Sequence, residues 1–183
     1  MAPVRPGVRV IAGDAKGRRL IAPRTTSTRP ATDRLRESIF GTLGARSEGA
    51  AVLDLFAGSG ALGIEALSRG AARATFVERD PAAVDAIRRN VAATGFADRV
   101  RVVRGDAAAY LRADEEMYDI VFCDPPYADA ELLALLLAGP ELRRVTRGVL
   151  VLRALRKHAP GIPEQWTVER ERDVGEDVVR YLR

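Results

Sequence analysis

The spacing of apolar residues changes along the chain between a period of two and a period near 3.6, and these changes predict its secondary structure. From residue 51 onward, short apolar runs alternate with segments whose apolar residues recur at helical spacing. We expect strands at residues 52–56, 74–78, 100–103, 118–123 and 149–152, and helices at 60–69, 81–94, 106–112 and 130–138. Strands and helices that alternate in this order form a parallel sheet with helices on both of its faces.

The end of the chain departs from this alternation. Residues 166–172 and 178–182 are extended runs on either side of the turn sequence DVGE, which predicts a closing antiparallel hairpin. Residues 153–163, just before them, are expected to form a loop. This loop is basic and contains Arg153, Arg156, Lys157 and His158. The fold class expected is therefore α/β, with a mostly parallel seven-stranded sheet.

The N-terminal residues form a separate pattern ahead of this unit. Residues 8–22 alternate as strands do around the turn sequence GDAKG, which predicts a small β-hairpin. An isolated hairpin is marginally stable in water, so it must pack against the main body or a partner. Residues 23–32 lack apolar periodicity and are expected to be a linker. We therefore divide the chain into an N-terminal arm and linker, 1–32, and a main domain, 33–183.

Thr32 is a suitable cap for a helix over residues 33–43, and Asp33 favours the positive end of that helix. The apolar side chains of this helix are expected on one face; they are Leu35, Ile39, Phe40 and Leu43. Arg34 and Arg36 are expected outside this face, where they could contact either phosphate or solvent.

The composition limits the class of protein. A hydrophobic fraction of 47% and a charged fraction of 30% are typical of a soluble globular chain. The single cysteine, Cys123, lies inside an apolar run, which excludes a disulfide framework and fits a reducing cytosol. The chain has no apolar span long enough for a membrane and no signal-peptide pattern, so we expect a cytoplasmic protein.

The charge is distributed unevenly along the chain. Residues 1–46 contain ten Lys and Arg against three Asp and Glu, a net charge of +7. The remaining residues contain 19 Lys and Arg against 22 Asp and Glu, a net charge of −3. A basic arm on a mildly acidic body favours a polyanionic partner such as nucleic acid, although a merely solvated basic tail has the same composition. The expected phosphate contacts are Lys16, Arg18, Arg19, Arg29, Arg34 and Arg36.

A glycine loop follows the first strand of the alternating unit. Gly58, Gly60 and Gly63 have the spacing G-x-G-x-x-G, which allows a tight turn and a close ligand ahead of a helix N-terminus. Glu78, twenty residues after Gly58, ends the second strand, where the hydroxyls of a ribose would lie. By themselves these residues fit a nicotinamide dinucleotide as well as an S-adenosyl sulfonium donor.

Two further acids favour the sulfonium donor. Asp54 begins the glycine loop, where a carboxylate would repel a pyrophosphate but suits a cationic ligand with an amino group. Asp106 follows the third strand and could accept a hydrogen bond from an adenine amino group. Asp106 could equally well cap the helix that begins at Ala107.

The fourth strand ends at Asp124-Pro125-Pro126-Tyr127. Two prolines hold a rigid, non-helical turn and provide no N–H groups, while the carbonyls of Asp124 and Pro125 stay available as acceptors. Acceptors beside the ring of Tyr127 suit a planar amine attached to an aromatic base, although an ordinary proline-rich turn has the same residues. In an open α/β sheet this turn and the glycine loop meet at one edge, so both ligands would share one crevice.

Residues 54–60, DLFAGSG, together with the Asp-Pro-Pro-Tyr sequence, resemble the motifs of S-adenosylmethionine-dependent amino-methyltransferases. Residues 29–40, RPATDRLRESIF, and the hairpin before them resemble the ribosomal small-subunit methyltransferase D family more specifically. That resemblance covers residues 8–181 and implies a Rossmann-like class I methyltransferase fold. It also implies transfer of a methyl group to the N2 amine of a guanine in 16S rRNA.

The resemblance implies roles for individual residues. Contacts to S-adenosylmethionine fall on Gly58, Gly60, Glu78 and Asp106, with Asp54, Phe56 and Ala107 in the same loops. Asp124 and the carbonyl of Pro125 would hold the guanine amino group, and Tyr127 would stack on the base. The implied partner is 16S rRNA within a small subunit or an assembly intermediate, with ribosomal proteins alongside, and we expect a monomer without a metal.

Three other functions stay open at this point. DNA adenine methylation would need a sizeable target-recognition domain, for which the chain lacks room. A nicotinamide oxidoreductase would leave Asp54 and the two prolines unexplained. A non-catalytic rRNA-binding assembly factor could keep the same fold without turnover.

Overall fold

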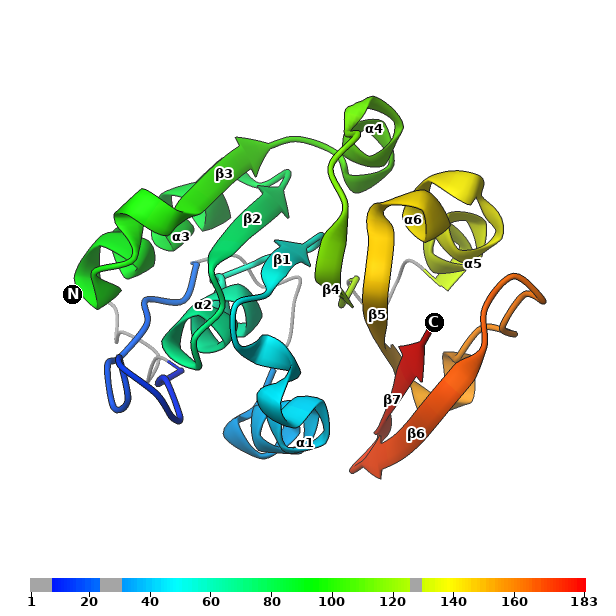
Figure 1. The fold of residues 1–183 in the computed structure, drawn as a ribbon, viewed down its shortest axis with the longest axis horizontal. Helices are drawn as coiled ribbons and strands as arrows, with labels where there is room; N and C mark the ends of the chain where they lie inside the picture. The colour runs from blue at the N-terminus through cyan, green and yellow to red at the C-terminus, as the bar shows by residue number, and fades with distance from the viewer. Residues whose placement is uncertain (1–7, 24–30, 126–129) are drawn as a thin grey trace.

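The computed structural model describes residues 8–23, 31–125 and 130–183, and its strands form one sheet (Figure 1). The sheet has seven strands in the order β3-β2-β1-β4-β5-β7-β6. Their bounds are Ala51–Asp54 for β1, Arg73–Glu78 for β2, Val100–Arg104 for β3, Tyr118–Cys123 for β4, Thr146–Leu155 for β5, Val168–Val174 for β6 and Asp177–Leu182 for β7. Strands β1 to β5 are parallel, and β7 is antiparallel to both of its neighbours. The predicted α/β fold with a closing antiparallel hairpin is confirmed.

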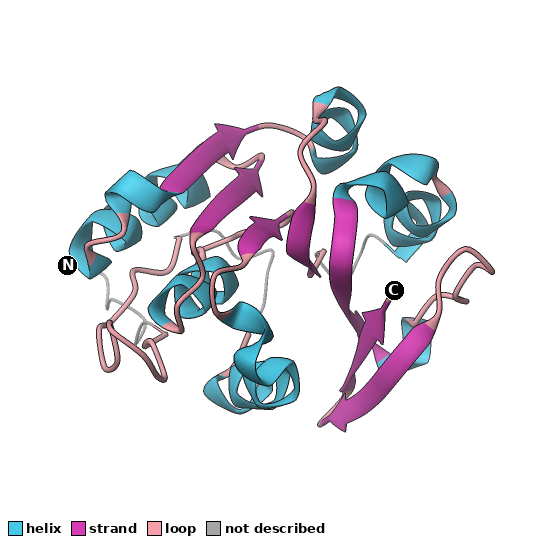
Figure 2. Ribbon diagram, viewed as in Figure 1, coloured by secondary structure: helices cyan, strands magenta, loops and turns pink. Residues whose placement is uncertain are grey.

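Six α-helices of the described residues cover the sheet, as Figure 2 shows. Their bounds are Asp33–Leu43 for α1, Ala61–Ser68 for α2, Pro81–Thr94 for α3, Ala107–Ala113 for α4, Ala130–Ala138 for α5 and Pro140–Val145 for α6. Short 3₁₀ turns lie at Gly44–Ser47, Ala97–Arg99 and Arg156–His158. The short helix α6 was not predicted from the sequence.

Local capping residues explain where the best-predicted helix begins and ends. The side chain of Asp80 accepts a hydrogen bond from the N–H of Ala82 at 2.8 Å, and Pro81 occupies the first turn of α3. Gly95 ends the helix with a φ of 78°, a left-handed conformation that glycine adopts without strain. These signals are contiguous in the sequence, which is why the predicted bounds of α3 are confirmed.

Alternate residues of the strands point to opposite faces of the sheet and form two apolar cores. Val52, Phe76 and Ile120 pack on one face, against α1, α2, α3 and the N-terminal hairpin. Leu53 and Val121 pack on the other face, against α4, α5 and α6. Because helices cover both faces, the strands are continuous apolar runs and do not alternate between apolar and polar residues, as expected of a parallel sheet.

Strand β5 is longer than predicted at both ends. Beyond Leu152 it has no partner in β4, but Arg153, Ala154 and Leu155 continue to pair with β7. The prediction that these three residues belong to a basic loop is wrong, because the antiparallel hairpin supplies their hydrogen-bonding partner from the far end of the chain.

The N-terminal hairpin is confirmed as a short antiparallel turn with an isolated bridge between Arg9 and Arg19. It is bound to α2 through backbone groups. The N–H groups of Ile11 and Ala12 donate to the carboxylate of Glu65 at 2.8 and 3.1 Å. The N–H of Ala15 donates to the hydroxyl of Ser68, and Val10 and Leu20 are buried in the core. The hairpin therefore packs against the body, as its marginal stability requires; its division from the body at residue 32 stays a prediction.

Arg36 contradicts the expectation that it lies outside the apolar face of α1. It is fully buried, and its guanidinium bonds Asp33 at 2.8 Å, Glu65 at 3.4 Å and the carbonyl of Arg9. Arg36 precedes Phe40 by four residues and Leu43 by seven, so the three share one helix face. It joins the hairpin to α2 and is not available to RNA.

Candidate active site

The glycine loop connects β1 to α2 and is anchored at both sides. The N–H of Leu55 donates to the carbonyl of Phe122 in β4, and that of Ala57 donates to Val77 in β2. Gly58 and Gly60 have φ values of 55° and 78°, which explains why glycine occupies both positions. Gly63 is needed for packing rather than for the approach of a ligand. A Cβ at this position would lie 2.3 Å from the ring of Phe76, so glycine allows α2 to pack on β2.

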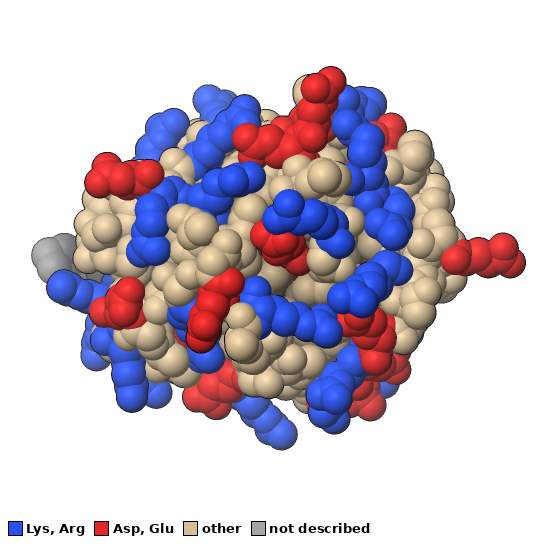
Figure 3. All heavy atoms as spheres, in the orientation of Figure 1, with Lys and Arg blue, Asp and Glu red and all other residues tan. Residues whose placement is uncertain are grey.

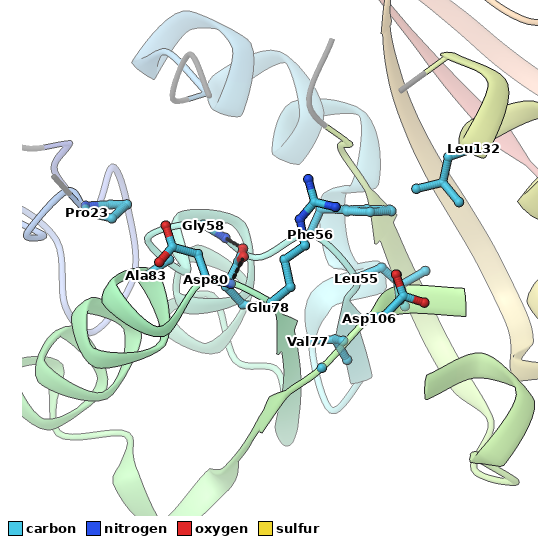
Figure 4. A pocket seen from close by; sticks show the side chains of 13 residues that line it. Pro23, Leu55, Phe56, Gly58, Val77, Glu78, Asp80, Ala83, Asp106 and Leu132 are labelled. Carbon is cyan, nitrogen blue, oxygen red and sulfur yellow. Dashed lines mark hydrogen bonds between the residues drawn. The ribbon is translucent and has the colours of Figure 1, made fainter. Parts of the chain in front are cut away.

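Glu78 ends β2 and supports the glycine loop. One carboxylate oxygen accepts from the N–H of Gly58 at 2.8 Å, and the other accepts from the N–H of Asp80 at 2.9 Å. Figure 4 shows these two bonds at the wall of a pocket. The amide of Gly58, which would have to face a pyrophosphate, is thus already paired with a carboxylate.

Asp54 lies beneath the loop rather than on the pocket wall. It is 1% exposed and accepts a hydrogen bond from the N–H of Gly63 at 3.2 Å. Burial raises the pKa of Asp54 to about 7, the Gly63 N–H opposes that rise, and the nearby Asp124 and Glu78 add to it. A cation bound near Asp54 would therefore favour its ionised form.

Asp106 caps a helix and also lines the pocket. Its side chain caps α4 by accepting from the N–H of Ala109 at 2.9 Å. It also lines the same pocket as Glu78. Carboxylate oxygens have spare acceptor capacity, so capping does not exclude a ligand contact.

The pocket between these loops contains about 620 Å³ of space, part of it open to solvent. It is formed by five of the predicted donor-binding residues, Phe56, Gly58, Glu78, Asp106 and Ala107, and by eight others, Pro23, Leu55, Val77, Arg79, Asp80, Ala83, Gly105 and Leu132. Gly60 and Asp54 are not on its wall. Figure 4 shows that Leu132, from α5, lies across the pocket from Gly58.

Asn90 is a supporting residue that the sequence analysis missed. Its side-chain amide donates to the carbonyls of Ile21 and Ser59, both at 2.9 Å, and its carbonyl accepts from the N–H of Ile21 at 2.7 Å. It therefore ties the segment that leads from the hairpin to Pro23 directly to the glycine loop. Asparagine inside a helix carries no sequence signal for such a bridge.

Asp124 follows β4, the strand that pairs with β1, so it lies at the same sheet edge as the glycine loop. Its carboxylate oxygens accept from one guanidinium nitrogen of Arg153 at 3.1 and 3.3 Å. Burial raises the pKa of Asp124, and Arg153 opposes that rise. Pro125 is buried beside it, whereas Pro126 and Tyr127 fall outside the described residues.

The predicted RNA contacts fall into three groups. Lys16, Arg18, Arg19 and Arg34 are exposed, Arg36 is buried, and Arg29 lies outside the described residues. Figure 3 shows Lys and Arg across the whole width of one face, with acidic side chains between them. Charge alone therefore does not single out one RNA-binding surface on this face.

The described part of the chain has neither a membrane-spanning helix nor a cluster of metal-ligating side chains. None of its helices is long and apolar enough to cross a membrane. Within residues 8–23, 31–125 and 130–183, no group of three or more His, Cys, Asp and Glu side chains could hold a metal ion. Cys123 is fully buried in β4, and burial raises the pKa of its thiol.

Comparison with known proteins identifies relatives of the whole chain. Residues 8–183 match the family model described as Conserved hypothetical protein 95. The ribosomal RNA small subunit methyltransferase D of Escherichia coli K12 is 38% identical over 184 residues, which cover 96% of this chain and 89% of that protein. YlbH of Bacillus subtilis, named as a candidate rRNA methyltransferase, is 46% identical over 132 residues, 70% of this chain and 72% of that protein.

Solved structures agree with these relatives. The Escherichia coli protein yhhF, named as a candidate methyltransferase, superimposes with a TM-score of 0.82 and 36% identity over 96% of each chain. An RNA methyltransferase of Salinibacter ruber in complex with S-adenosyl-L-homocysteine has a TM-score of 0.62 at 21% identity, covering 84% of this chain and 92% of that one. The second likeness concerns the fold alone.

Proposed function

This chain belongs to the ribosomal RNA small subunit methyltransferase D family, and from that membership we propose that it methylates the N2 amine of a guanine in 16S rRNA. The methyl donor is S-adenosylmethionine. We further propose that the substrate is a small ribosomal subunit or an assembly intermediate in the cytoplasm. The bases of the proposal are the crevice at the carboxyl edge of the sheet and the residues that surround it.

One observation carries the proposal: the glycine loop and the Asp124 segment open onto the same side of the molecule. The strands that lead into them, β1 and β4, are hydrogen-bonded neighbours. The pocket beside Gly58 is closed from the other side by Leu132, in the helix that follows the Asp124 segment. A donor in this pocket would lie next to an acceptor held at Asp124, as methyl transfer requires.

The pocket residues fit S-adenosylmethionine better than a dinucleotide. Glu78 stands at the end of β2, where its carboxylate can accept from ribose hydroxyls. Asp106 can accept from an adenine amino group, and Phe56 and Leu132 provide apolar surface for the base. The carboxylates of Glu78 and Asp54 would repel a pyrophosphate, and the Gly58 amide is already bonded to Glu78. When bound, S-adenosylmethionine supplies a methyl carbon made electrophilic by its positive sulfur.

The residues at Asp124 then orient the amine. The lone pair of a guanine amino group is delocalised into the ring and becomes nucleophilic when the nitrogen pyramidalises. The Asp124 carboxylate and the Pro125 carbonyl accept hydrogen bonds from the two N–H groups of this amine. These bonds direct the lone pair of its nitrogen toward the donor pocket. The proton that the nitrogen loses passes to Asp124 or to water, and a strong base is unnecessary. Tyr127 would stack on the base.

The test is an assay with tritiated S-adenosylmethionine that offers DNA, naked 16S rRNA and assembled small subunits separately. We expect label in 16S rRNA only, and most of it from subunits. Digestion to nucleosides should place the label in N2-methylguanosine. Label in DNA would refute the proposed substrate, and label in another nucleoside would refute the proposed target atom. If no nucleic acid is labelled, the proposed activity is refuted.

A further inference from the structure

Arg153 is a buried side chain at the centre of three elements. It lies in β5, is 4% exposed, and its guanidinium bridges two carboxylates. One terminal nitrogen donates to both oxygens of Asp124, at 3.1 and 3.3 Å, and the other donates to Asp177 at 3.1 Å. The group thus joins the end of β4 to the start of β7 across β5.

The C-terminal hairpin determines where this arginine lies. Strand β5 continues past the last residue that pairs with β4, because Arg153 to Leu155 pair with Val179 to Asp177 of β7. The same pairing places Asp177 at the level of Leu155. Deleting the antiparallel hairpin would therefore remove both the backbone partner of Arg153 and Asp177, one of the carboxylates that Arg153 bonds within the described residues.

Asp124 is surrounded mostly by acidic groups. Asp177 faces it from β7, Asp54 interacts with it from β1, and the Cys123 thiol precedes it in β4. Glu78 acts on Asp54 in turn. Among the described residues, Arg153 is the cation that bonds Asp124, and it opposes the rise that burial causes in the pKa of Asp124. A protonated carboxyl would present an O–H donor to the incoming amine, where an acceptor is needed.

We propose that Arg153 is a positioning residue for methyl transfer: it holds the Asp124 carboxylate in one orientation and in its acceptor form beside the substrate amine. This inference rests on the proposed function and deepens it. In the step itself, the amine nitrogen forms a bond to the methyl carbon while the carbon–sulfur bond breaks with its electron pair passing to sulfur. The nitrogen then loses one proton to Asp124 or water. Arg153 is 4% exposed and bonds the carboxylates of Asp124 and Asp177, so the role proposed for it acts through Asp124.

The alternative is a purely structural role, in which the ion pair of Arg153 contributes to folding alone. Buried ion pairs often contribute little net stability, while breaking one by removing a single partner is costly. Stability therefore cannot separate the two roles. The pH dependence of turnover can, because only a positioning role links the protonation of Asp124 to kcat.

The experiment compares Arg153→Met and Arg153→Lys with the wild-type chain on small subunits, between pH 6 and pH 9. We expect Arg153→Met to lower kcat at neutral pH by about 10- to 100-fold, because without the guanidinium the Asp124 carboxyl is protonated more readily and then no longer accepts a hydrogen bond from the amine. Its kcat should recover as the pH rises, because alkaline solution ionises Asp124 again. Arg153→Lys should retain part of the activity, and the affinity for S-adenosylmethionine should stay within about twofold of wild type in both.

Arg147→Met is the matched control. Arg147 and Asp119 form an ion pair at 2.6 Å between the same two strands, β5 and β4, at the opposite edge of the sheet. This variant should keep the wild-type pH profile. A carbon-13 NMR titration of Asp124 in Arg153→Lys provides a readout without catalysis, and its midpoint should match that of kcat. A pH profile unchanged in Arg153→Met, or a loss of kcat in that variant that no pH restores, would overturn the inference, while an inactive wild-type chain would refute the proposed function instead.

Discussion

The two halves of the crevice hold their acidic side chains in different ways. In the donor half, formed by the loops after β1, β2 and β3, the acids bond backbone N–H groups. Glu78 accepts from Gly58, Asp54 from Gly63 and Asp106 from Ala109. In the acceptor half, formed by Asp124 with β5 and β7, the partner is the side chain of Arg153. Backbone donors cannot change their charge, whereas a buried ion pair depends on both partners.

Because of this difference, we expect substitutions in the two halves to change different kinetic and binding constants. Changes in the donor half should alter the affinity for S-adenosylmethionine and leave turnover of the bound complex nearly intact. Changes in the acceptor half should alter turnover and leave the affinity intact. Glu65 lies in α2, outside both halves, and bonds partners far along the chain, including the N–H of Ile11 and the guanidinium of Arg36.

The largest effect should come from Glu65→Ala. Glu65 is fully buried, accepts from the N–H groups of Ile11 and Ala12, and faces the guanidinium of Arg36, which is buried as well. Removing one partner leaves a buried charge poorly compensated, so the free energy of unfolding should fall by about 3 kcal/mol or more. Urea denaturation measures this change, with the exposed Glu164→Ala as the control.

If folded Glu65→Ala loses turnover while it keeps its affinity for S-adenosylmethionine, the donor half also depends on a distant charge pair. The division between the two halves would then be incorrect. If Glu65→Ala lowers only the free energy of unfolding, and its kinetics are normal below the unfolding transition, the division between the two halves is supported.

The next largest effect should come from Asp124→Ala. Loss of the acceptor carboxylate should lower kcat by about 100- to 1,000-fold, the usual cost of removing one preorganised polar contact to the reacting group. The dissociation constant of S-adenosylmethionine, measured by calorimetry, should change by less than about threefold. Asp85→Ala removes an exposed carboxylate whose partner Arg88 lies 3.8 Å away, and it should be neutral. Retained kcat in Asp124→Ala would remove this residue from the mechanism.

Glu78→Ala should have the opposite effect to Asp124→Ala: it should weaken the binding of S-adenosylmethionine and leave kcat nearly unchanged. The variant loses acceptors for the ribose and frees the amides of Gly58 and Asp80, so S-adenosylmethionine should bind about 10- to 100-fold more weakly. At saturating donor, kcat should stay within about threefold of wild type. Titration calorimetry and donor-saturation kinetics check both values. A normal affinity would mean that Glu78 supports only the empty loop.

The same difference explains which parts of the site could be predicted from the sequence. Gly58, Glu78 and Asp106 end or follow predicted strands within contiguous motifs, and their partners lie between 2 and 20 residues away. Arg153 is 29 residues from Asp124, and it meets Asp124 only because β7 extends β5. Its expected place in a basic loop was wrong for that reason.

Arg36 shows the same limit within one helix. Its spacing from Phe40 and Leu43 places it on the buried face, but only one of the carboxylates it bonds, Asp33, lies in the same helix. The other, Glu65, comes from α2, 29 residues later. Periodicity therefore predicted the strands, every described α-helix except α6, and the edge of the sheet where the crevice lies. It could not predict which charges are buried together, because strand pairing and helix packing bring these partners from distant positions.

The smallest effect should come from the exposed cations of the hairpin, which lie outside both halves. Replacing Lys16, Arg18 and Arg19 with Ala should weaken rRNA binding several-fold at low salt and reduce the salt dependence of the binding constant, by about 0.7 per lost contact for single-stranded RNA. The affinity for S-adenosylmethionine should not change, although Asn90 connects the end of the hairpin to the glycine loop. Filter binding at several salt concentrations checks this.

A matched triple variant controls for the loss of charge itself. Arg88, Arg170 and Arg172 are also exposed, and their replacement with Ala removes the same charge from α3 and β6. If both triples weaken binding equally, the effect is one of net charge, and the hairpin has no special role. If only the hairpin triple reduces the salt dependence, its cations contact phosphate. Because neither result should alter kcat at saturating RNA, a fall in kcat for the hairpin triple would show that the hairpin also positions the target base at Asp124.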